Sequence, residues 1–228
     1  MVDPAQGSND EPGPSRPAIR VVIVDDHRMV ADGLAIILRD EPDLQVVGTA
    51  ATAAEGIASV EENSPDVVIM DYNLPDENGA AATMTIKSRW PGVAVIMLTG
   101  SGAEEALAKA IEAGCSGFLV KELRGPTIPD AIRAVHRGEL VIHAGAIHSA
   151  LGSLRADSID KHQLTARELE VLRMMATGLS TEALAAKLFV STNTVRNHIQ
   201  SVLMKLGAHS KLEAVAIGIR EGLVALRY

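Results

Sequence analysis

Aromatic residues are scarce in this chain: Phe, Tyr and Trp together make up 2% of its 228 residues. Aliphatic side chains must therefore fill the interior, and a binding surface of stacked aromatic rings is excluded. The single cysteine, Cys115, excludes an internal disulfide and a zinc cluster built on several thiolates. The longest stretch without a charged residue, 140–154, is shorter than the roughly 20 apolar residues of a membrane helix, so we expect no membrane span.

Each part of the chain is also poor in charges of one sign: the N-terminal part has few basic residues, and the C-terminal part has few acidic ones. Residues 1–160 carry 12 basic and 24 acidic residues, whereas 161–228 carry 9 basic and 5 acidic ones. This division predicts two domains with different partners, the basic one a candidate for nucleic acid, although a merely solvated surface is the alternative. Residues 1–17 contain four Pro and no apolar core of a secretory signal, so we expect a disordered tail and a cytoplasmic location.

Between residues 18 and 138, five short apolar runs alternate with helical patterns. The apolar runs are 19–24, 44–49, 67–70, 93–98 and 117–120, and the helical patterns are 29–38, 53–62, 80–87, 104–113 and 127–137. Apolar strands separated by single helices are typical of a parallel sheet covered on both faces. We therefore predict an α/β doubly wound five-stranded parallel sheet at 18–138. A linker at 139–163, with some helix near 144–154, and a small all-α domain at 164–228 are expected to follow.

Polar side chains follow four of the predicted strands. They are Asp25 and Asp26, Asp71, Thr99 and Lys121. Because ligands of open parallel sheets bind beyond the carboxyl ends of the strands, we expect these side chains to share one crevice. Three adjacent carboxylates repel one another unless a cation joins them, and an oxygen-only ligand set suits Mg²⁺. With Lys121 and Thr99 available for the remaining oxygens of a phosphoryl group, the pattern predicts a phosphoryl-acceptor site with a nucleophilic carboxylate.

This set, in this order and spacing, resembles the receiver domain of two-component response regulators over about 19–138. The resemblance implies a flavodoxin-like fold and a regulator rather than an enzyme, with Asp71 accepting a phosphoryl group from a sensor histidine kinase. It implies that Asp26, Asp71 and the backbone carbonyl of Asn73 ligate Mg²⁺, with Asp25 holding metal-bound water. The residues that contact the phosphoryl group and act as a switch would be Thr99, Phe118 and Lys121.

The basic segment carries a helix-turn-helix pattern. Thr165 and Glu168 form a capping box for a first helix, which Gly178 stops. A second helix begins at 180–182, and a short turn at 189–191 leads to a third helix over about 192–206. In a helix-turn-helix the later helix enters the major groove, and the polar side chains of this one suit base edges and phosphates.

From about 164 to 224 the chain resembles the LuxR-type helix-turn-helix of response regulators of the NarL/FixJ class. That resemblance implies a regulator of transcription that binds double-stranded DNA. Base contacts are implied for Arg196, Asn197 and Gln200, and phosphate contacts for Thr194 and Lys205. Asn193 stands where Lys is common, so one phosphate contact of the family is expected to be missing.

The last predicted helix, about 210–221, carries two neighbouring apolar stripes. One stripe is expected to face the core of its own domain and consists of Leu212, Val215, Ala216 and Ile219. The second consists of Ala214, Ile217 and Gly218. It could be a homodimer face of the active protein, as the resemblance also implies, a patch buried against the receiver, or scattered exposed residues.

We therefore predict a response-regulator transcription factor whose phosphorylation on Asp71 controls DNA binding. A phosphorylation-independent regulator with the same fold is the main alternative. A Mg²⁺-dependent phosphohydrolase is weaker, because its nucleophile would usually lie in an Asp-x-Asp motif, whereas Asp25 and Asp26 are adjacent. A ligand-sensing LuxR-type regulator would need an aromatic-lined pocket, which so few aromatic residues can hardly supply.

Overall fold

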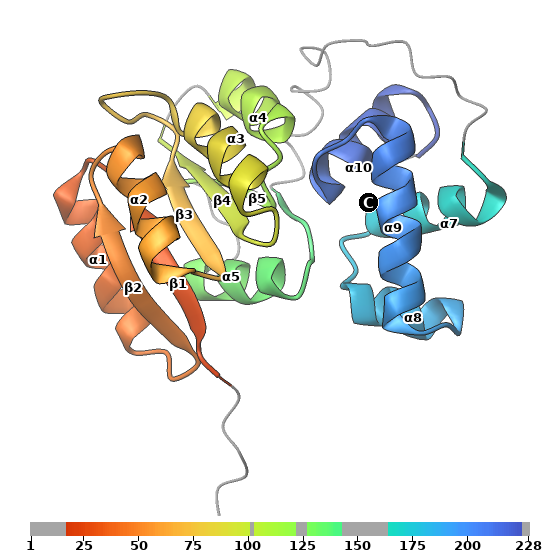
Figure 1. Cartoon of the computed structure of the whole chain (residues 1–228), viewed down its shortest axis with the longest axis horizontal. Helices are drawn as coiled ribbons and strands as arrows, with labels where there is room; N and C mark the ends of the chain where they lie inside the picture. The colour runs from red at the N-terminus through yellow and green to blue at the C-terminus, as the bar shows by residue number, and fades with distance from the viewer. Residues whose placement is uncertain (1–16, 101–102, 122–126, 143–163, 225–228) are drawn as a thin grey trace, which may run out of the picture.

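The computed structural model describes residues 17–100, 103–121, 127–142 and 164–224. Figure 1 shows an N-terminal domain of strands and helices beside a C-terminal domain of helices alone. The predicted tail, apart from residue 17, and the predicted helix near 144–154 lie outside the described residues. The α/β and all-α division predicted from the sequence is confirmed.

A six-stranded parallel sheet forms the centre of the N-terminal domain, in the order β2-β1-β3-β4-β5-β6. The strands are β1 (Ile19–Val24), β2 (Leu44–Ala50), β3 (Val67–Asp71), β4 (Ala94–Thr99), β5 (Gly117–Val120) and β6 (Val141–Ile142). The five predicted strands are confirmed, but the predicted number is one too few. Strand β6 pairs with Gly117 and Phe118 of β5, inside the segment predicted as linker. A strand of two residues is too short to show a periodic pattern, so this edge strand could not be predicted.

Helices cover both faces of the sheet (Figure 1). They are α1 (Arg28–Arg39), α2 (Ala53–Asn63), α3 (Gly79–Arg89), α4 (Ala103–Glu112) and α5 (Ile128–His136). Alternate strand side chains point to opposite faces. In β1, Val21 and Ile23 therefore pack in one core with α1 and α5, whereas Val22 and Val24 pack in another with α2, α3 and α4. This burial on both sides explains why the strand runs are apolar throughout.

The C-terminal domain consists of α7 (Ala166–Met175), α8 (Thr181–Leu188), α9 (Thr192–Leu206) and α10 (Lys211–Arg220). Each helix begins after a Ser or Thr whose side-chain oxygen accepts a hydrogen bond from a backbone N–H of the first turn. The predicted capping box of Thr165 and Glu168 is present, and Gly207 ends α9 in the left-handed conformation at φ 64°. None of the described helices is long and apolar enough to cross a membrane.

Helix α10 contributes to two hydrophobic cores. Part of the stripe predicted to face its own domain packs against the other domain, and the second stripe packs inside its own domain. Leu212 and Ala216 are buried in the core that holds α2, α3 and α4, so they join α10 to the N-terminal domain. Ala214 and Ile217 are buried among the helices of the C-terminal domain, and a Cβ at Gly218 would lie 3.0 Å from the side chain of Leu172. The prediction of a dimer face at Ala214, Ile217 and Gly218 is therefore wrong, because this stripe fills the interior of its own domain.

Candidate functional site

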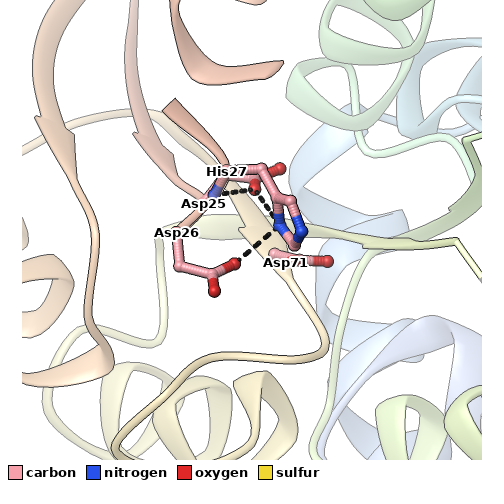
Figure 2. A group of neighbouring side chains, drawn as sticks. All are labelled: Asp25, Asp26, His27 and Asp71. Atoms are coloured by element: carbon pink, nitrogen blue, oxygen red, sulfur yellow. Dashed lines mark hydrogen bonds and ion pairs between the residues drawn. The ribbon is translucent and has the colours of Figure 1, made fainter. Parts of the chain in front are cut away.

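Three carboxylates and an imidazole meet at the carboxyl ends of β1 and β3 (Figure 2). Asp25 and Asp71 are buried, with 3% and 2% of their surfaces exposed, whereas Asp26 and His27 reach solvent. One potential ligand atom from each of the four lies within 4.8 Å of all the others. The parallel sheet thus brings the predicted acidic residues together. It adds His27, which sequence reasoning missed although this residue directly follows the acidic pair.

Lys121 enters the same pocket from the end of β5. Its Nζ donates to Asp25 Oδ2 at 2.7 Å and lies 3.3 Å from Asp71 Oδ1. Burial opposes the charge of this ammonium, but the two carboxylates outweigh burial and raise the pKa of Lys121. The pKa of Asp71 is also raised, first by burial and then by the charge of Asp25, and Lys121 offsets only part of this. The pocket therefore holds more negative charge than its lysine balances.

The loop after Asp71 is fixed by close backbone contacts. A Cβ at Gly79 would lie 2.1 Å from the backbone oxygen of Asp71, so only glycine fits there. The carboxylate of Asp76 accepts hydrogen bonds from the N–H groups of Ala53 and Ala54 at 2.9 and 3.0 Å, which ties the loop to the start of α2. Asn73, whose carbonyl is a predicted metal ligand, lies in this loop and forms a β-bridge with Asn78. The loop is thus held in place on both sides of the predicted ligand.

The two predicted switch residues beside Lys121 are both buried. Thr99 is the last residue of β4, and its backbone oxygen accepts a hydrogen bond from the N–H of Lys121 at 2.8 Å. Phe118 is fully buried in the core that also contains Leu212 and Ala216 of α10. Phe118 therefore faces the core that joins the two domains and not the outer surface.

The residues present fit a divalent cation. The pKa of Asp71 is raised by its own burial and by the charge of a neighbouring carboxylate. A bound cation would relieve this repulsion. Carboxylate and carbonyl oxygens are the ligands that Mg²⁺ prefers. The acidic pocket is thus suited to hold such an ion.

The third helix of the C-terminal domain, α9, presents polar side chains on one side. Arg196, Asn197 and Gln200 are exposed and Thr194 is half-buried, whereas Val195 and Ile199 pack in the domain core. The side-chain oxygen of Ser191 caps the helix and also lies 2.8 Å from the hydroxyl of Thr194. The face predicted to read bases is therefore a surface of this domain.

Lys205, for which a phosphate contact is predicted, lies near the end of the same helix. Its Nζ instead donates to Glu168 Oε2 at 2.7 Å, and the N–H of Thr165 donates to the same oxygen at 2.7 Å. Burial favours a raised pKa for Glu168, but these hydrogen bonds outweigh it and lower the pKa. This lysine thus joins the end of α9 to the start of α7, because a buried carboxylate there requires a cation, and the phosphate contact of Lys205 stays a prediction.

The receiver reaches α9 as well as α10. A cleft of about 570 Å³ separates the domains and is lined by α3 and the end of α4 on one side and by Gln200, Leu203 and Met204 of α9 on the other. At one end of α10, Lys211 Nζ donates to the backbone oxygen of Gly138 at 2.8 Å and to the hydroxyl of Thr181 at 2.9 Å. Part of the predicted DNA-reading face thus lies beside the receiver.

A doubly wound receiver with a strand-end acidic pocket, joined to a helix-turn-helix, defines a class of regulator, and comparison with known proteins agrees. A model of the response regulator receiver domain matches residues 21–133, and a model of bacterial regulatory proteins of the luxR family matches 162–217. The chain belongs to the two-component response regulators that carry a luxR-type DNA-binding domain and regulate transcription.

Individual relatives resemble the chain over nearly its whole length. It is 31% identical to the transcriptional regulatory protein DegU of Brevibacillus brevis over 227 residues, covering 92% of this chain and 96% of DegU. It is 35% identical to the transcriptional regulatory protein LiaR of Bacillus subtilis over 209 residues, covering 90% and 99%. The crystal structure of ChrA, a response regulator of a heme-sensing two-component system, matches with a TM-score of 0.51 and 30% identity, covering 91% and 100%.

Proposed function

We propose that Asp71 accepts a phosphoryl group from a sensor histidine kinase and that this modification controls DNA binding by α9. The observation that carries the proposal is the position of Asp71, a buried carboxylate whose Oδ1 lies 3.3 Å from the ammonium of Lys121 and whose acidic neighbours can hold a cation. Asp26, Asp71 and the carbonyl of Asn73 would hold Mg²⁺, with Asp25 binding a metal-bound water. When bound, the ion supplies charge that neutralises the oxygens of the transferred group.

The chain's own groups then have distinct tasks in the transfer. A carboxylate oxygen of Asp71 forms the new bond to phosphorus while the bond between phosphorus and the donor nitrogen breaks. The ammonium of Lys121, already 3.3 Å from Asp71 Oδ1, is placed to pair with an oxygen of the incoming group. Thr99, at the end of the neighbouring strand, supplies a hydroxyl for another oxygen. Their rearrangement would be the switch between two states.

Phe118 and α10 offer a physical route from Asp71 to the DNA-binding domain. Phe118 lies in β5, three residues before Lys121, and shares one core with Leu212 and Ala216 of α10. A shift of β5 would therefore alter the packing that holds α10 against the receiver. Release of α10 would also separate Gln200 from the cleft beside α3 and α4. The active protein would then bind DNA as a homodimer, through a face other than the buried stripe of α10.

On DNA, Arg196, Asn197 and Gln200 would contact base edges, and Thr194 a phosphate. Asn and Gln can bond adenine bidentately, and Arg can bond guanine. Loss of one such contact typically costs about 1 to 3 kcal/mol and relaxes the preference at one base. Arg196→Ala should therefore lose sequence discrimination, whereas Arg39→Ala, which removes the same charge from α1, should not.

The test joins input and output in one sample. Full-length protein is incubated with acetyl phosphate and Mg²⁺, and phosphorylation and binding to a selected DNA site are measured together. Asp71→Asn should abolish both labelling and the gain in DNA affinity, whereas Asp32→Asn, an exposed aspartate of α1, should change neither. If Asp71→Asn still labels at the wild-type rate, the acceptor assignment is wrong. If labelling is lost but DNA affinity never depended on it, the regulator acts without phosphorylation.

A further inference from the structure

We propose that His27 supplies its Nδ1 atom as a ligand to the divalent cation of the acidic pocket, so that the pocket binds transition-metal dications such as Ni²⁺ and Co²⁺ as well as Mg²⁺. This inference rests on the proposed function, because it takes the carboxylates of that site as the other ligands. Its new content is the nitrogen ligand and the class of metal that follows from it.

The geometry places the imidazole inside the ligand set. His27 Nδ1 lies 2.8 Å from Asp26 Oδ1 and 3.4 Å from Asp25 Oδ1, and Figure 2 shows the ring between the carboxylates of Asp26 and Asp71. The four ligand atoms span at most 4.8 Å. Around one ion with bonds of about 2.1 Å, opposite ligands are about 4.2 Å apart, so a small closure of the pocket would bring Nδ1 and the carboxylates of Asp26 and Asp71 onto one metal.

Helix capping does not account for the inward direction of this ring. His27 occupies the N-cap position of α1, but within the described structure its side chain makes no capping hydrogen bond. Its side chain is 66% exposed, so solvent is available to the imidazole on its outer side. The backbone N–H of His27 donates to Asp25 Oδ1 at 2.9 Å, which fixes the residue at the rim of the pocket. The ring is therefore held where it can contact a bound ion.

The two sides of the pocket leave room for such a ligand. Lys121 contacts Asp25 Oδ2 and Asp71 Oδ1 and is 21% exposed, so it lies on the inner side. His27 and Asp26 form the more exposed side. There, Nδ1 lies 2.8 Å from Asp26 Oδ1. A cation bound on this side would therefore contact Nδ1 and the carboxylate of Asp26 together.

The chemistry of the donor atoms determines which metals bind more tightly when His27 is a ligand. Imidazole nitrogen suits Ni²⁺ and Zn²⁺, whereas carboxylate, carbonyl and water oxygens suit Mg²⁺ and Mn²⁺. Removal of the nitrogen should therefore reduce affinity selectively. A histidine that only orients Asp26 by a hydrogen bond would instead affect all dications to the same extent.

The test uses tag-free, full-length protein, so that no added histidines bind metal. Calorimetric titrations with Mg²⁺ and with Ni²⁺ compare the wild type, His27→Gln and His136→Gln. His136 is the matched control, because it is an exposed histidine of α5. It lies beside Pro65 and Val93, at the end of the strands opposite the acidic pocket. We expect His27→Gln to lower Ni²⁺ affinity at least about tenfold and to leave Mg²⁺ affinity within about twofold. His136→Gln should change neither.

A spectroscopic signature provides a second measurement. Mn²⁺ bound to the wild type should show electron spin-echo modulation from a directly bound nitrogen, and His27→Gln should lose it. Equal losses of Ni²⁺ and Mg²⁺ affinity, or a nitrogen signal that survives His27→Gln, would overturn the role of His27 while leaving the carboxylate site intact. If the wild type binds no Mg²⁺, or Asp71→Asn binds it normally, the proposed site fails and the inference fails with it.

Discussion

Each domain places a lysine against a buried carboxylate, yet the two pairs differ in charge balance. In the C-terminal domain, Lys205 meets the single carboxylate of Glu168, whose pKa is lowered. In the receiver, Lys121 meets Asp25 and Asp71 together, and the pKa of Asp71 is raised. A balanced pair stabilises the fold as it stands. A pocket with surplus negative charge is less stable than it would be with that charge balanced, and a bound cation can relieve the repulsion.

The largest test of this contrast is the addition of Mg²⁺, which should act on the receiver alone. A ligand that binds only the folded state stabilises it by about 2.7 kcal/mol at a hundredfold excess over its Kd. Urea unfolding followed by Trp90 fluorescence reports the receiver, because the single Trp of the chain lies at the end of α3. Hydrogen exchange of α7 and α9 reports the other domain. Stabilisation of both domains to the same degree, or of neither, would contradict a metal site in the receiver.

Breaking the balanced pair should have the next largest effect. Lys205→Met leaves the buried Glu168 without its cation and should cost about 2 kcal/mol, measured as faster hydrogen exchange in α7 and α9. Lys187→Met removes the same charge from an exposed position of α8 and is the matched control, expected to change stability by less than about 0.5 kcal/mol. If the two variants behave alike, the ion pair carries no structural weight and a phosphate contact by Lys205 returns as the better reading.

Removing a charge from the unbalanced pocket should do the opposite and stabilise the protein. In the presence of a chelator, Asp71→Asn relieves the repulsion from Asp25 and should raise the stability of the receiver by on the order of 1 kcal/mol. The measurement is again urea unfolding of Trp90, with Asp32→Asn as the control for loss of a surface charge. A destabilised Asp71→Asn receiver would mean that Lys121 already balances the pocket.

The same contrast explains what could be predicted from the sequence. Strand-end residues such as Asp25, Asp71 and Lys121 were predictable as one site, because a parallel sheet brings the carboxyl ends of its strands to one edge. The caps at Thr165 and Ser191 were predictable because they depend on residues three positions away. Local pattern and topology thus sufficed for the pocket and for the helices.

Pairings between distant segments were not predictable in this way. Lys205 and Glu168 are 37 residues apart, and nothing in either helix shows that they meet. The stripes of α10 are both apolar, so their order around the helix could not show that Leu212 faces the receiver and Ile217 its own domain. His27 could have been found from its position next to Asp26, had nitrogen ligands been considered beside oxygen ligands.

The smallest expected effect is the change in stability as the pH falls. Its sign should be opposite for Asp71 and for Glu168. Because the pKa of Asp71 is raised, its ionised form destabilises the metal-free receiver, and this cost is relieved as the pH falls through the raised pKa. Because the pKa of Glu168 is lowered, its contribution is complete above the ordinary Glu pKa of about 4.3 and is lost as the pH falls through the folded value.

The comparison that isolates these two groups is each wild-type domain against its neutral variant, in chelator, from about pH 6 downward. The stability gained by Asp71→Asn should shrink as the pH falls, because the wild-type Asp71 then becomes protonated and is neutral like the Asn. The stability lost by Glu168→Gln should stay constant until about pH 4.3 and shrink only below it. We expect changes of a few tenths of a kcal/mol per pH unit, less than the limit of about 1.4 for one full proton. If both differences shrink over the same pH range, the two carboxylates share one kind of environment and the contrast between the domains is lost.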